Sequence, residues 1–234
     1  MQERRSVSQS GISQFFGRVY GNMGVGLLIT AAITYLLGYV FHDQYVNFIS
    51  SNPVFYWVML LLPFVFIIFG SGARAYANPG RARLMFFGLA ASEGTTMAVI
   101  MAQFSGTSVV AALVVTGVIF GTMSLVGIYG NKDLSRAGSI ATTALVGALV
   151  MTVLNFLIHS SGLAMLINYA ILAIFIVLVA YDNQTLKRFY AQAEAQGDTA
   201  ISALAIQGAL MLYLDFLNLF ITILQIFGVG NDNN

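Results

Sequence analysis

The sequence predicts an all-α integral membrane protein with seven transmembrane helices. Only 8% of its 234 residues are charged and 58% are hydrophobic, whereas about 25% of residues are charged in soluble domains. Seven apolar runs are each about as long as the roughly 20 residues that a helix needs to cross a bilayer. The runs do not alternate between polar and apolar residues, so they are not the strands of an outer-membrane barrel.

The seven apolar runs follow one another with mostly short connections. We predict transmembrane helices at 19–41, 53–73, 83–103, 107–129, 138–159, 163–182 and 203–229. Turn-forming and charged residues fill the connections, among them HDQY, ARAYANPGRAR, YGNKDLSRAG and NQTLKRFYAQAEAQGDTA. Because no soluble block interrupts the pattern, we predict one seven-helix membrane domain at 19–229. A short cytoplasmic tail at 1–18 and an outer tail at 230–234 flank it.

The basic residues predict the orientation of the chain. With seven spans, all ten fall on one side of the membrane: Arg4, Arg5, Arg18, Arg74, Arg81, Arg83, Lys132, Arg136, Lys187 and Arg188. Cytoplasmic loops carry the excess of Lys and Arg, so we expect the N-terminus in the cytoplasm and the C-terminus outside. We expect a bacterial inner (plasma) membrane, because the tails are short and no cleavable or organellar signal is evident.

The composition excludes several classes of function. The chain has no cysteine, which excludes disulfides, thiolate nucleophiles and cysteine metal sites. Its formal charge of +1 argues against a nucleic-acid partner. His42 and His159 are two histidines without further ligands, so we predict neither a metal nor a cofactor. Both lysines lie in connections, which excludes a retinal Schiff base in the last helix.

Three acidic residues fall within predicted spans: Glu93, Asp182 and Asp215. A carboxylate at a helix centre costs about 3 kcal/mol on insertion scales, so such residues face the bundle interior and usually have a function. Asn218 and Thr222 follow Asp215 at helical spacing and form one polar stripe with it. We therefore expect the last helix inside the bundle, with this stripe lining a polar pathway. The alternative is a buried aspartate that neighbouring hydroxyls satisfy and that supports packing only.

Asp182 and Asp215 are predicted to meet. Their helices are joined on the basic side of the membrane. A rise of about 1.5 Å per residue places both acids in the inner half of a core about 30 Å thick. Two carboxyl groups that meet share one proton and titrate as a pair. The alternative for Asp182, which lies close to Lys187, is a position at the membrane interface.

Two further charged residues are candidates for the same interior. Arg74 ends the second span in FIIFGSGARAY, and its side chain can turn back to the level of the aspartates. The alternative is an arginine whose stem follows apolar surface while its head stays in water. Glu93 lies near the membrane midplane, in LAASEGTTMAVI. We expect it to line a polar pathway, and the alternative is a structural acid with satisfied hydrogen bonds.

Two segments carry a resemblance to a known family. AYDNQTLK, at 180–187, and LYLDFLNLF, at 212–220, resemble the last two helices of the Bax inhibitor (transmembrane Bax inhibitor motif) family. The resemblance extends over nearly the whole chain in number of spans, length and basic inner loops. It implies two three-helix layers around a central C-terminal helix. It maps the paired aspartates of the family onto Asp182 and Asp215, and its latch arginine onto Arg74, whereas Glu93 matches no family motif.

The resemblance also implies a function. Family members are associated with pH-sensitive calcium leak across membranes and, in animals, with protection from cell death. We therefore expect a cation leak channel in the lipid bilayer, with calcium or another cation as the permeant ion. Asp182, Asp215 and Arg74 would sense pH and gate it. The residues identify no protein partner.

Three alternatives to a channel remain. A proton-coupled transporter would also use buried acids. A regulator that binds other membrane proteins would tolerate the loss of Asp215, whereas a channel would not. An intramembrane aspartyl protease also places a Tyr-Asp pair on its sixth helix and a second aspartate on its seventh. Such proteases carry Gly-x-Gly-Asp there, and the bulky residues Leu212, Tyr213 and Leu214 of this chain would crowd an extended substrate. We therefore expect no enzyme.

Overall fold

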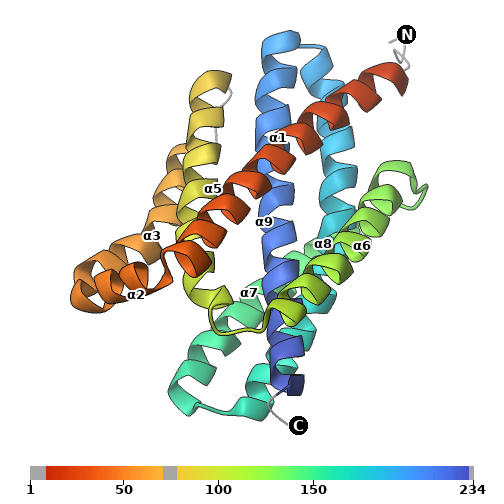
Figure 1. Ribbon diagram of the computed structural model, residues 1–234. Helices are drawn as coiled ribbons and strands as arrows, with labels where there is room; N and C mark the ends of the chain where they lie inside the picture. The colour runs from red at the N-terminus through yellow and green to blue at the C-terminus, as the bar shows by residue number, and fades with distance from the viewer. Residues whose placement is uncertain (1–8, 71–77, 232–234) are drawn as a thin grey trace, which may run out of the picture. The chain divides into compact units, whose positions relative to one another are not determined.

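The described part of the chain consists of helices and the short turns that join them. The structure, a computed structural model, describes residues 9–70 and 78–231, and these ranges contain helices and no strand (Figure 1). In chain order the helices are α1 (Gln9–Tyr35), the π-helix η1 (Leu36–Val40), α2 (His42–Ser51), α3 (Pro53–Gly70), α5 (Pro79–Met101), α6 (Gly106–Tyr129), α7 (Ser135–Ile158), α8 (Ser161–Glu194) and α9 (Asp198–Asn231). The prediction of an all-α protein is confirmed.

Within the described ranges, six helices are long and apolar enough to cross a membrane: α1 with η1, α5, α6, α7, α8 and α9. The helices α2 and α3 meet this criterion only as a pair, which is bent by 104°. The described residues thus contain six candidate spans by length and composition, or seven if the bent pair is one span. Large apolar side chains cover the outside, including Leu28 at 70% and Phe156 at 76% exposure. Soluble proteins rarely expose large apolar patches, so this surface fits a lipid environment.

The segment between the first two predicted spans is a helix and not the expected connection. Tyr45 of α2 is buried, and its hydroxyl donates to the Thr95 carbonyl oxygen of α5 at 2.8 Å. The chain then turns at Asn52, which has φ −129° and ψ 73°. The residue before a proline is driven away from helical conformation, so Pro53 explains why α2 and α3 do not form one straight helix.

Two other helices are longer than the hydropathy predicts. The first begins at Gln9, well before residue 19, so Arg18 lies within α1 and not in a tail. The helix α8 continues beyond Asp182 to Glu194, because the residues that follow are good helix formers. Gly197 follows shortly after the end of α8, and its φ of 95° is a conformation that glycine adopts readily and that ends a helix. Asp182 therefore lies inside a helix and not at its end.

The chain forms two compact units. The first contains Met1–Gln103 and Leu186–Tyr213, and the second contains Phe104–Thr185 and Leu214–Asn234. Both α8 and α9 contribute residues to each unit. Half of the most apolar stretch of α9 is buried, compared with 11% for α7. This burial fits the prediction that the last helix is an interior one.

In the first unit, α1, α5 and α9 meet around a buried hydroxyl pair. Thr30 of α1 donates to the Ala90 carbonyl oxygen of α5 at 2.9 Å and is hydrogen-bonded to the Tyr213 hydroxyl at 2.7 Å. A threonine hydroxyl has a single proton, so Tyr213 donates to Thr30. The Tyr213 ring packs edge-on against Phe86, with ring centroids 5.4 Å apart. These contacts hold the middle of α9 against α1 and α5.

Candidate functional site

In the second unit, α8 and α9 bring two acids together. The side chains of Asp182 and Asp215 are hydrogen-bonded to each other. Asp215 is only 5% exposed, and its Oδ2 has no hydrogen-bond partner among the described residues. Asp182 is partly buried. Two ionised carboxylates have no donor between them, so this bond requires one proton held by the pair. These are the two acids that helix rise and membrane thickness predicted to lie at similar depth.

The residues on either side of Asp182 fix the rotation of α8. Successive side chains on a helix point about 100° apart, so Tyr181 and Asn183 face different neighbours. The Tyr181 ring lies against Gly138 of α7, in the space that a side chain there would fill. Asn183 is completely buried and donates to Ser124 Oγ of α6 at 3.2 Å. With α8 held between α6 and α7, Asp182 is turned toward α9.

Gln184 adds a third attachment, to the loop between α6 and α7. Its Oε1 accepts from the Leu134 backbone N–H at 2.8 Å, and its Nε2 donates to the Lys132 carbonyl oxygen at 2.8 Å. Neither Gln184 nor Asn183 was among the predicted site residues. The sequence could have indicated them, because both follow Asp182 in AYDNQTLK within a predicted membrane helix. Polar side chains that are buried there require hydrogen-bond partners.

Close packing around the acid pair depends on Gly127 and not on Gly117 or Gly121, although all three lie in α6. Gly117 and Gly121 fit the small-xxx-small pattern that favours close helix packing, but a β-carbon at either would meet no described atom within 4 Å. The close approach of α6 to α8 occurs at Gly127. A β-carbon there would collide with the Ala180 carbonyl oxygen and with Asn183 Cβ.

The polar stripe of α9 continues from the pair along one face of the helix. Asn218 Nδ2 donates to the Leu214 carbonyl oxygen at 2.8 Å, and Thr222 Oγ1 donates to the Asn218 carbonyl oxygen at 2.7 Å. Thr222 is buried and Asn218 is partly buried. The backbone of α9 thus accepts from one amide N–H of Asn218 and from the Thr222 hydroxyl, which leaves the side-chain oxygens as the groups able to bind a cation.

The structure does not group Glu93 with the aspartates. Glu93 lies on α5 in the first unit, where it is partly buried and interacts electrostatically with Tyr213. It makes no hydrogen bond or ion pair with any residue of the described ranges. The predicted latch, Arg74, lies outside the described residues.

Comparisons with known proteins match nearly the whole chain. A family model described as "Inhibitor of apoptosis-promoting Bax1" matches residues 12–232. A membrane protein of Streptococcus pyogenes serotype M3 is 33% identical over 222 residues, which cover 94% of this chain and 95% of the relative.

Relatives also occur in Gram-negative bacteria. The inner membrane protein YbhL of Escherichia coli K12 is 32% identical over 94% of this chain and 93% of its own length. A protein of Caulobacter vibrioides is 32% identical over 95% of this chain and 90% of its own length. Each of these relatives is therefore similar to the chain over almost its full length.

Proposed function

Because this chain belongs to the Bax inhibitor family of membrane proteins, we propose that it is a pH-sensitive cation leak channel that passes calcium. The observation that carries the proposal is the hydrogen bond between Asp182 and Asp215 inside an apolar helix pair. A carboxylate at the centre of a membrane helix costs about 3 kcal/mol on insertion scales. Two such acids in contact are better explained by a proton switch than by packing.

The proposed gate is this pair of acids. In the resting state one proton bridges the two carboxyl groups and one negative charge remains, which Arg74 would neutralise. Loss of the shared proton leaves two like charges. At a separation of about 4 Å and an effective dielectric near 20, they repel by roughly 4 kcal/mol. Gain of a second proton removes the charge that would hold an arginine. A repulsion of that size shifts a two-state population substantially.

The proposed pathway runs along the stripe of α9. Asp215, Asn218 and Thr222 offer carboxylate, amide and hydroxyl oxygens, which are the ligands that a hard cation such as calcium prefers. Glu93 is proposed to attract cations within its own unit, because it is a partly buried acid without a partner among the described residues. In this proposal the protein lies in the lipid bilayer, and calcium or another cation is the permeant ion.

We propose a location in a bacterial inner membrane, with the N-terminus in the cytoplasm and the C-terminus outside. The ten basic residues support this orientation through the positive-inside rule, and the similarity to the inner membrane protein YbhL supports the membrane. Fusions of a cytoplasmic and of a periplasmic reporter enzyme to the C-terminus test it. We expect activity from the periplasmic reporter only, and activity from the cytoplasmic one would contradict the orientation.

The function is tested by calcium flux into liposomes that contain the purified protein and a calcium-sensitive dye. With equal pH on both sides, a leak moves calcium down its gradient without exchanging protons, whereas a proton-coupled transporter changes the internal pH as calcium crosses. A regulator of other membrane proteins gives no flux. We expect flux above that of protein-free liposomes, with an amplitude that changes across a pH series. No flux at any pH from folded protein would contradict the proposal, and we expect no enzymatic turnover.

A further inference from the structure

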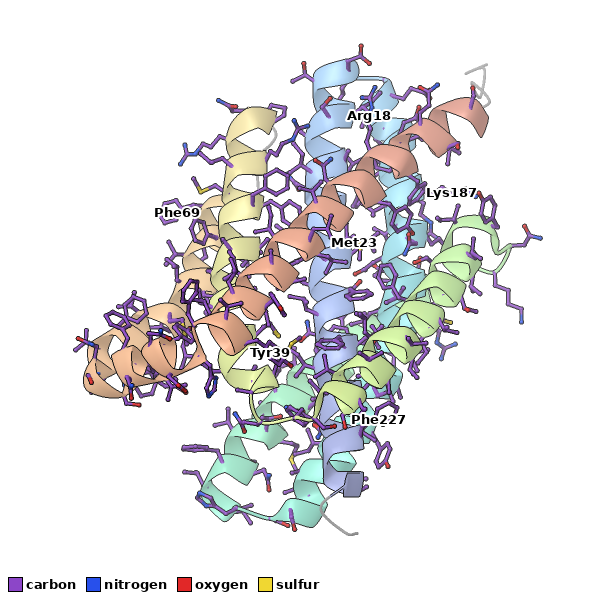
Figure 2. The ribbon with its side chains drawn as sticks, in the orientation of Figure 1. Arg18, Met23, Tyr39, Phe69, Lys187 and Phe227 are labelled. Carbon is purple, nitrogen blue, oxygen red and sulfur yellow. The ribbon has the colours of Figure 1, made fainter. Side chains whose placement is uncertain are left out.

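A pocket of about 270 Å³ lies in the first unit, among α1, α5 and the beginning of α9. Arg18, Asn22 and Val25 of α1 line it, together with Arg83 of α5 and Ser202 of α9. Figure 2 shows Arg18 on α1, near the N-terminal end of α9. The pocket is smaller than the roughly 300–1,000 Å³ of sites for drug-sized ligands. Its size suits a small headgroup.

Among the described residues, no ion pair neutralises the two arginines of the pocket. Neither guanidinium group forms a hydrogen bond or ion pair with any residue in the described ranges. Arg18 interacts electrostatically with Tyr190, whose hydroxyl donates to Glu194, and neither Glu194 nor Asp198 lines the pocket. Two unpaired arginines that face one cavity create a site for an anion, and a guanidinium group matches the geometry of a phosphate.

The wall formed by α1 changes from charged to apolar along the helix. Arg18, Asn22 and Val25 lie at helical spacing on one face. Val25 is 45% exposed, and Leu28, one turn further, is 70% exposed. On α5, Leu84 follows Arg83 directly and is 67% exposed. The site thus has a cationic end next to an apolar surface. A phospholipid has the matching arrangement, with an anionic headgroup next to apolar acyl chains.

We propose that this pocket binds the phosphate group of an anionic phospholipid. Arg18 and Arg83 contact the phosphate oxygens, Asn22 and Ser202 provide neutral hydrogen-bond donors, and the acyl chains lie against Val25, Leu28 and Leu84. Basic pockets between membrane helices are known sites for anionic headgroups. Both arginines belong to the set that the sequence places on the cytoplasmic side, so the lipid would come from that leaflet. This inference does not depend on calcium leak.

Native mass spectrometry of the detergent-solubilised protein, titrated with phosphatidylglycerol and separately with phosphatidylcholine, tests the proposal. We expect the wild type to prefer phosphatidylglycerol. The double variant Arg18→Gln, Arg83→Gln should lose about tenfold or more in affinity, because hydrogen bonds between charged groups are lost. Arg18→Lys with Arg83→Lys keeps the charge and should retain part of the affinity. Arg81→Gln is the matched control, since Arg81 is an exposed arginine of the same helix outside the pocket.

Three results would overturn the proposal. An affinity of the folded double glutamine variant equal to that of the wild type would show that the pocket is not the site. An equal loss of affinity in Arg81→Gln would show that the lipid responds to the overall charge of the protein and not to this pocket. Inorganic phosphate that competes with the lipid at comparable concentration would assign the pocket to a soluble phosphate compound and not to a lipid.

Discussion

Tyr181 of α8 lies with its ring against Gly138 of α7, in the space that a β-carbon at position 138 would occupy. On the other side of α8, Gly127 of α6 approaches the Ala180 carbonyl oxygen equally closely. The two glycines therefore allow α6 and α7 to come close to the segment of α8 that carries Asp182. This relationship links the packing of the second unit to the geometry of the aspartate pair.

We expect Gly127→Ala and Gly138→Ala to destabilise the protein. Overpacking of this kind costs about 1–3 kcal/mol. The loss should be larger for Gly127→Ala, because it meets a backbone carbonyl, whereas the Tyr181 ring can rotate away from residue 138. Thermal unfolding of the detergent-solubilised protein measures the effect.

The matched controls for these variants are Gly117→Ala and Gly121→Ala. Both glycines lie in α6 and face open space, and alanine is favoured over glycine in a helix by up to about 1 kcal/mol. We expect unchanged or raised melting temperatures for the controls. Equal destabilisation of all four variants would contradict the assigned contacts.

Tyr213→Phe should destabilise the first unit by about 1 kcal/mol, the typical net contribution of one hydrogen bond. The lost bond is the one from the Tyr213 hydroxyl to Thr30. Tyr129→Phe is the control, because Tyr129 is 73% exposed. A double-mutant cycle with Thr30→Ala checks the assignment, and strictly additive effects would show that the two hydroxyl groups are not coupled.

Much of the pair geometry follows from the sequence, because helix rise and membrane thickness limit where Asp182 and Asp215 can lie. The ends of the helices are predicted less accurately from the sequence. Hydropathy marks the membrane core only, so the polar helical extension of α8 beyond Asp182 and the short helix α2 read as connections. The packing role of glycines depends on how each helix is rotated. Spacing alone does not define that rotation, which is why Gly117 fits a packing pattern and faces open space.

Arg74→Ala should raise the basal calcium flux and reduce its dependence on pH if Arg74 holds the second span against the aspartate pair. The same liposome assay measures both quantities. Arg81→Ala is the control, because it removes an arginine from the same basic stretch. If Arg74→Ala behaves like the wild type, Arg74 is an anchor at the membrane interface and not a latch.

Glu93→Gln should lower the calcium flux and leave the pH midpoint unchanged, since Glu93 is proposed to attract cations and not to sense protons. Glu194→Gln, which replaces an exposed acid near the end of α8, should have no effect on the flux. A shifted midpoint in Glu93→Gln would place Glu93 in the sensor, and an unchanged flux would remove it from the pathway.

The most direct measurement of the central claim is calcium flux across a pH series for Asp182→Asn and Asp215→Asn in liposomes. An asparagine cannot take up or lose a proton as an aspartate does, so neither variant can form the proton-sharing pair and each should flatten the dependence of the flux on pH. Asp43→Asn, which replaces an exposed aspartate of α2, should keep the wild-type midpoint and amplitude. If Asp182→Asn and Asp215→Asn also keep that midpoint and amplitude, the pair is not the pH sensor and the proposed gate is wrong.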